Sequence, residues 1–189
     1  MQVGQWSLLV GVLGLVFALV TYRRVLSEPT GTPAMQEIAA AIHEGAMAFL
    51  NREYRTLVVF AVVLAAIMAI AISLPTALAF LLGASFSMAA GFVGMNAATH
   101  GNVRTTQAAT KGQGAALSVA FSGGAVMGMA VASLGVLGLS VLYILIPDPA
   151  VKSEVINGFA MGASLIALFA RVGGGIYTKS ADVGEIGRA

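Results

Sequence analysis

The residues with the clearest chemical potential lie in the stretch "ARVGGGIYTKSADVG", residues 170–184. Lys179 is a point charge that could neutralise phosphate oxygens, and Asp182 is a carboxylate of the kind that Mg²⁺ takes together with substrate phosphates. The two residues are also three apart, so a simple helical ion pair explains them equally well. The glycines at 173–175 do not form a Walker A loop, because the residue before the lysine is Thr178. A phosphate and magnesium site and a surface ion pair therefore both stay open.

Arg171 lies in the same stretch, at the end of a run that is apolar enough to cross a bilayer. An ionisable side chain at membrane depth costs several kcal/mol unless it is paired or faces water. At about 100° per residue, a polar stripe shares the face of Arg171; it includes Asn157, Ser164, Gly175, Thr178 and Asp182. We therefore expect Arg171 to face a polar lumen and to need an acidic partner, which the other spans do not offer. Snorkelling to the interface is the alternative.

The histidines are the second group with chemical potential. His43 and Glu44 invite a metal or acid/base interpretation, but a zinc-binding helix needs its second histidine four residues later, where Met47 stands. A solvated or inter-helix polar patch is the favoured interpretation. His100 precedes Gly101, and we expect it to cap the end of a helix.

The elements that hold these residues follow from composition. Hydrophobic residues make up 58% of the 189 residues and charged residues 10%, whereas soluble domains carry about a quarter charged residues. The net charge of +2 does not indicate a nucleic-acid partner, and the chain has no cysteine. Dry membrane interiors demand helices unless a barrel closes, and strand-type alternation is absent. We predict an all-α polytopic transmembrane helix bundle that forms one domain over residues 1–189.

Five apolar segments are each long enough to cross about 30 Å of hydrocarbon. They cover residues 6–22, 57–74, 76–99, 115–146 and 155–177. Apolar residues at helical spacing also predict an amphipathic cytoplasmic helix over residues 34–56 that runs into the second apolar segment. Small residues recur every three or four positions in the spans, which indicates close helix packing rather than a ligand role and more helix neighbours than five helices supply.

The positive charges predict the orientation of these spans. One side of an alternating topology carries nine lysines and arginines, and the other side carries only Lys152. Cytoplasmic loops retain positive charge, so the N-terminus is expected outside and the C-terminal tail in the cytoplasm. Arg23 and Arg24 follow the first apolar segment, and this order is not that of a cleavable signal peptide. The nine charges are Arg23, Arg24, Arg52, Arg55, Arg104, Lys111, Arg171, Lys179 and Arg188.

Four segments together resemble the N-terminal part of the membrane-integral, vacuolar-type inorganic pyrophosphatases. They read "IAAAIHEGAMAFLNREY", "GASFSMAAGFVGMNAATHGNVRTTQAA", "LSVAFSGGAVMGM" and "GASLIALFARVGGGIYTKSADVG". The resemblance covers residues 1–184 and is most specific in the last segment. It implies a translocase that couples hydrolysis of Mg²⁺-pyrophosphate at the cytoplasmic face to H⁺ or Na⁺ transport across the lipid bilayer, with K⁺ as a further candidate cofactor. It also implies a homodimer of sixteen-helix subunits in a bacterial inner (plasma) membrane.

The resemblance also implies roles for single residues. The arginine that matches Arg171 belongs to the ion gate and pairs with acidic residues of other helices. The lysine that matches Lys179 contacts pyrophosphate, and the aspartate that matches Asp182 belongs to the substrate and magnesium site. Carboxylates from later helices position the attacking water, so no catalytic residue is assigned within this chain.

The sequence departs from the family after residue 184. The family continues "ADLVGKVE" and then an acidic loop, whereas this chain reads "EIGRA". Eleven of the sixteen helices, the water-positioning carboxylates and the acidic partner of the gate are expected to be missing. We therefore expect a truncated, frameshifted or partial chain that is inactive alone. The alternative is a small five-helix membrane scaffold or minimal transporter, whose charged tail anchors it at the interface.

Overall fold

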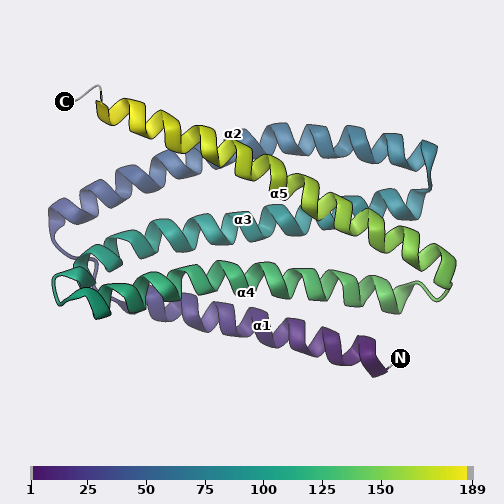
Figure 1. Ribbon diagram of the computed structural model, residues 1–189, viewed down its shortest axis with the longest axis horizontal. Helices are drawn as coiled ribbons and strands as arrows, with labels where there is room; N and C mark the ends of the chain where they lie inside the picture. The colour runs from purple at the N-terminus through teal and green to yellow at the C-terminus, as the bar shows by residue number, and fades with distance from the viewer. Residues whose placement is uncertain (1, 187–189) are drawn as a thin grey trace.

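The computed structural model describes residues 2–186 of the chain as five long α-helices with no strand among them (Figure 1). Their bounds are α1 Gln2–Ser27, α2 Pro33–Ala71, α3 Leu74–Ala109, α4 Gln113–Leu145 and α5 Pro149–Ile186. Each helix is long and apolar enough to cross a membrane, judged by length and composition. The predicted all-α transmembrane bundle is confirmed. Arg188, counted above among the charges of the tail, lies outside the described residues.

The second apolar segment ends earlier than predicted, and its helix includes the amphipathic segment that was expected to run into it. α2 stops at Ala71 because Ser73 caps the next helix, where its side chain accepts a hydrogen bond from the amide of Thr76. At its other end α2 begins at Pro33, so residues 34–56 and the second apolar segment form one continuous helix of 39 residues. Such a helix is about 58 Å long, roughly twice the hydrocarbon thickness. One end of α2 therefore projects beyond the bilayer.

Helix α3 lies at the centre of the bundle, where it packs against α2, α4 and α5, while α1 packs mainly against α4. α5 crosses obliquely over the other helices (Figure 1). The crossing of α3 and α5 depends on two glycines. A Cβ atom at Gly83 would overlap the carbonyl oxygen of Phe159, and one at Gly162 would overlap that of Phe80. Small residues thus let the two backbones touch, as the sequence predicted.

His100 does not cap a helix end, so that prediction was wrong. α3 continues to Ala109, and the chain turns only at Gly112, whose φ of 123° favours glycine. The helix is held beyond His100 by Arg104, which donates one hydrogen bond to the backbone oxygen of His100 at 2.7 Å and another to that of Leu26 at 3.1 Å. The second bond satisfies a carbonyl in the last turn of α1 and fixes that helix end to α3.

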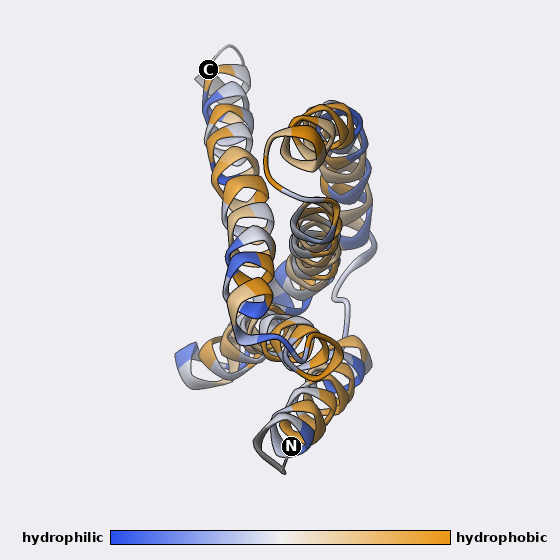
Figure 2. Cartoon of the chain, turned by 90° about the vertical axis from the view of Figure 1, so that its right-hand side faces the viewer, coloured by the Kyte–Doolittle hydropathy of each residue, from blue (hydrophilic) through white to orange (hydrophobic). Residues whose placement is uncertain are grey.

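The outer faces of the helices are apolar. Figure 2 shows hydrophobic residues around the outside of the bundle as well as between the helices. Trp6, Val59, Ile70, Phe121 and Ile176 are among the exposed large side chains. An apolar exterior of this kind suits lipid or further transmembrane helices rather than water.

Candidate functional site

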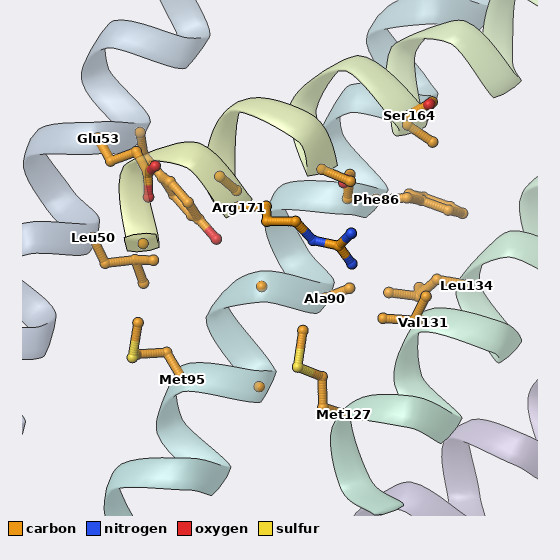
Figure 3. Close-up of a pocket in the computed structure, with 18 of the residues that line it drawn as sticks. Leu50, Glu53, Phe86, Ala90, Met95, Met127, Val131, Leu134, Ser164 and Arg171 are labelled. Carbon is orange, nitrogen blue, oxygen red and sulfur yellow. The ribbon is translucent and has the colours of Figure 1, made fainter. Parts of the chain in front are cut away.

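A cavity of about 800 Å³ opens between α2, α3, α4 and α5 (Figure 3). Most of its wall consists of alanine, glycine, methionine and aromatic side chains. Two charged residues interrupt this wall, Arg171 from α5 and Glu53 from α2. Ser164 lies seven residues before Arg171 on the same face of α5 and lines the same cavity. The polar stripe predicted along the last helix therefore meets the cavity at Ser164 and Arg171.

Arg171 is the cation of this cavity. Its side chain extends from α5 into the space between α3 and α4, near Ala90 and in the direction of Leu134 (Figure 3). Within residues 2–186 its guanidinium has neither an ion pair nor a hydrogen bond, and the side chain is exposed to the open cavity. A charge among apolar walls needs water or an opposite charge. Arg171 is therefore placed where water or an acidic group from outside the described residues could contact its guanidinium.

Glu53 is the acidic residue that sequence reasoning missed. It is half-buried, lines the same cavity as Arg171, and lies so close to α5 that a Cβ atom at Gly173 would overlap its carboxylate. The sequence placed Glu53 on the polar face of the amphipathic segment, outside the second span. The signal that could have found it was the unbroken helical pattern through residue 56, which carries Glu53 toward the bundle.

Lys179 and Asp182 form an ion pair at the exposed end of α5. Lys179 Nζ lies 3.1 Å from Asp182 Oδ2, and the two side chains are 83% and 59% exposed. The pair is eight or more residues beyond Arg171, which is about 12 Å along a helix. The structure thus separates one cation inside the bundle from a charged pair outside it. The ion-pair interpretation is confirmed for this state, and the phosphate interpretation stays a prediction.

The residues described here suit a Mg²⁺ ion only in part. No group of three or more histidine, aspartate or glutamate side chains lies close enough together to hold a metal within the described part of the chain. Asp182 contributes one exposed carboxylate, and Mg²⁺ sites of this class use one or two carboxylates together with substrate phosphates. Asp182 therefore fits as a single metal ligand that needs phosphate oxygens to complete the site.

Contacts at both ends of α5 determine where its charged residues lie. Near its start, Glu154 Oε1 accepts hydrogen bonds from the hydroxyl groups of Ser73 at 2.9 Å and Thr76 at 2.8 Å. Near its end, the ring of Tyr177 stacks on Phe49 of α2 with centroids 4.8 Å apart. Tyr177 is two residues before Lys179, so this stacking holds the part of α5 that leads to Lys179 and Asp182 against α2.

Comparison with known proteins finds the family that the sequence motifs resemble, and the match extends over nearly the whole chain. The family described as "Inorganic H+ pyrophosphatase" matches residues 12–185. A putative K⁺-stimulated pyrophosphate-energized sodium pump of Clostridium tetani is 53% identical over 95% of the chain, and a K⁺-insensitive pyrophosphate-energized proton pump of Methanosarcina mazei is 47% identical over 93%. A K⁺-stimulated pyrophosphate-energized sodium pump of Thermotoga maritima is 38% identical over 97% of the chain.

The match covers only part of each relative. The chain spans 26% of the length of the Clostridium tetani and Methanosarcina mazei proteins and 28% of that of Thermotoga maritima. The matched residues include all five helices except the first turns of α1 and the last residue of α5. They also include every charged group of the cavity and of the exposed end of α5. The chain is therefore an integral membrane protein that belongs to the inorganic H⁺ pyrophosphatase family.

Proposed function

We propose that this chain forms the N-terminal part of a pyrophosphate-energised ion pump, which couples hydrolysis of Mg²⁺-pyrophosphate at the cytoplasmic face to transport of H⁺ or Na⁺. The observation that carries the proposal is the arrangement of charges along α5. One helix presents Arg171 to a cavity inside the bundle and the Lys179–Asp182 pair at its exposed end. A single rigid element thus connects a polar position at membrane depth to a site that water-soluble substrate can reach.

Lys179 and Asp182 are proposed to bind the substrate. The ammonium group of Lys179 would exchange its contact with Asp182 for pyrophosphate oxygens, since phosphate carries more negative charge than one carboxylate. Asp182 would then hold Mg²⁺ together with those oxygens, and the bound ion supplies neutralisation of their charge. No described residue is placed to act as a catalytic base, so the carboxylates that position the attacking water are proposed to come from the rest of the pump.

Arg171 is proposed to belong to the ion gate. Its guanidinium has no ion-pair partner among the described residues that line the cavity, so an acidic group from another helix of the complete pump can take up the contact. A shift of α5 at its substrate end would move Arg171, because both lie on one helix. The relatives include pumps named for protons and for sodium, and the proposal covers both cations.

The placement in the membrane follows from the positive charges. We infer that the N-terminus lies outside and the exposed end of α5 in the cytoplasm, in the inner membrane of a bacterium and as part of a homodimer. The charge asymmetry of the loops supports this orientation, in which Lys179 and Asp182 would face cytoplasmic pyrophosphate.

The test separates substrate binding from transport in a complete pump. In a hybrid, residues 12–185 replace the matching segment of the Clostridium tetani relative, and inverted vesicles are assayed for pyrophosphate hydrolysis and for ion uptake. The hybrid should do both in the presence of Mg²⁺, whereas liposomes that contain the 189-residue chain alone should do neither. A hybrid that inserts but neither hydrolyses nor transports contradicts the proposal, as does turnover by the chain alone.

Arg171→Ala gives the sharper result in the same hybrid. We expect the number of ions moved per pyrophosphate to fall while the KM for pyrophosphate stays close to that of the parent, because Arg171 lies far from the substrate end of α5. Ser164→Ala is the matched control, since it changes another residue of the same stripe and cavity wall without removing a charge. Unchanged coupling in Arg171→Ala would exclude a role in the gate.

A further inference from the structure

The only two histidines of the chain meet in the folded structure. His43 of α2 and His100 of α3 are 57 residues apart in sequence, yet their ring centroids lie 4.9 Å apart at an interplanar angle of 64°. His100 also lies beside Tyr22, near the end of α1, with ring centroids 6.4 Å apart. The sequence offered no second histidine on the helix of His43, and the fold supplies it from a neighbouring helix.

The hydrogen bond of His100 fixes which of its ring nitrogens carries the proton. Its Nδ1 lies 2.8 Å from the backbone oxygen of Asn96. A carbonyl oxygen can only accept a hydrogen bond, so Nδ1 must donate. In the neutral imidazole the proton is then on Nδ1, and Nε2 keeps a free lone pair.

The same conclusion holds for His43, through a threonine. Its Nδ1 lies 2.9 Å from Oγ1 of Thr99. The single hydroxyl proton of Thr99 points to the backbone of its own helix, where Oγ1 lies 2.9 Å from the oxygen of Met95. When the hydroxyl donates to that oxygen, Oγ1 accepts from His43, which again places the proton on Nδ1 and the lone pair on Nε2.

In this arrangement each ring donates a hydrogen bond from Nδ1 to an oxygen and keeps Nε2 free. Metal-binding histidines typically have the same arrangement, because they donate their other N–H to a backbone or side-chain oxygen. Neither Nε2 has a hydrogen-bond partner within residues 2–186. Two imidazoles bound to one tetrahedral Zn²⁺ through nitrogens about 2.0 Å away have centroids roughly 5 Å apart, so the centroid separation of 4.9 Å is compatible with one shared ion. Both side chains are only half-buried, so a cation from solution can reach them.

We propose that His43 and His100 form a two-histidine site for Zn²⁺ or another late first-row divalent cation, which bridges α2 to α3 through the two Nε2 atoms. Water completes the coordination, because no third histidine, aspartate or glutamate joins the pair among the described residues. The nearby positive charge of Arg104, which bonds the backbone of His100, weakens the attraction for a cation. Two ligands and this charge together make micromolar affinity the expectation.

The site is distinct in its chemistry from the substrate end of α5. Imidazole nitrogens suit Zn²⁺, Cu²⁺ and Ni²⁺, whereas Mg²⁺ takes oxygen ligands. A bound ion would tie the projecting half of α2 to α3, and both of these helices also line the cavity of Arg171. This inference does not depend on the proposed pump activity, and it can fail or succeed without it.

The test is calorimetric titration of ZnCl₂ into the 189-residue chain in nanodiscs, purified without a histidine tag and in the presence of excess Mg²⁺. We expect one Zn²⁺ per chain. His43→Gln and His100→Gln should each weaken binding at least about tenfold, because loss of a ligand costs no less than loss of a supporting contact. Glutamine is neutral, polar and close to histidine in size, so each variant removes an imidazole ligand with little change in side-chain volume. Thr99→Val, which removes only the acceptor for His43, should weaken binding roughly tenfold.

A matched control keeps the number of histidines constant. The double variant His43→Gln/Gln5→His carries two histidines but places the new one near the start of α1, at the far end of the bundle from His100 (Figure 1). It should bind as weakly as His43→Gln. Far-UV circular dichroism checks that each variant is folded, and the visible spectrum of the Co²⁺ form reports nitrogen ligation directly. The proposal is overturned if the folded parent chain binds no Zn²⁺, or if either single variant binds it as tightly as the parent.

Discussion

Replacement of Lys179 by methionine tests the substrate end of α5 most directly, because its structural and functional roles predict effects of very different size. Among the described residues the Lys179 side chain has one ion pair, with Asp182 at 3.1 Å, and the two side chains are 83% and 59% exposed. An exposed pair three residues apart contributes a few tenths of a kcal/mol. Lys179→Met should therefore shift the thermal midpoint of the protein by only about 1 °C.

The effect on substrate should be much larger. A hydrogen bond from a charged donor contributes about 1.5–3 kcal/mol, which corresponds to roughly 10- to 150-fold in affinity. We expect the KM for pyrophosphate in the hybrid pump to rise by this factor in Lys179→Met. Lys179→Arg should recover part of the loss, because it keeps the charge but changes the geometry of its donors.

The assay is phosphate release from inverted vesicles at several pyrophosphate concentrations and constant free Mg²⁺. Lys152→Met is the matched control: it makes the same change on the same helix, but at the opposite end, where Lys152 lies 4.0 Å from the ring centroid of Tyr143. Its KM should equal that of the parent. If Lys179→Met has the KM and kcat of the parent, the pair is a surface ion pair and the substrate role is wrong.

Two further predictions concern the framework that positions the charged residues. Gly162→Ala should lower the free energy of unfolding by about 1–3 kcal/mol, because the added Cβ overlaps the carbonyl oxygen of Phe80 and forces α5 away from α3. Denaturant titration of the chain in detergent measures this. Gly128→Ala is the control: an added Cβ there meets nothing within 4 Å, so the free energy of unfolding should stay the same or rise by up to about 1 kcal/mol, because alanine is the better helix former. Arg104→Gln should free the end of α1, because the hydrogen bond to Leu26 is lost. We expect faster hydrogen exchange in the last turn of α1 and a free energy of unfolding that is lower by about 1–3 kcal/mol. Unchanged exchange in that turn would contradict the anchoring role.

Local patterns in the sequence predicted those features that depend on one helix at a time. Hydrophobicity and segment length are enough to place five spans, since the bilayer sets the length that each must have. Helical periodicity likewise places Ser164 and Arg171 on one face of the last helix, and both line the same cavity. The match of the motif around Lys179 and Asp182 to a known family also needs only the order of residues.

Local patterns failed where neighbouring helices decide the outcome. His100 resembled a helix cap because a glycine follows it, but α3 runs on to Ala109 and Arg104 ties the added turns to α1. The amphipathic segment was expected to run into the second span, as α2 does, but nothing in that pattern showed which helices would face it, so Glu53 was not recognised as a wall of the cavity. A helix end depends on packing as well as on the residues that could form it.

The sequence by itself determined the class of the protein, its family and the helix that carries Arg171, Lys179 and Asp182. Only the tertiary structure decided that Arg171 and Glu53 share one cavity and that His43 meets His100. The physical reason is that the crossing of two helices depends on how closely their backbones approach, which small residues permit at many positions. Residues 57 apart in sequence become neighbours only when one particular crossing is selected, and no local pattern specifies that choice.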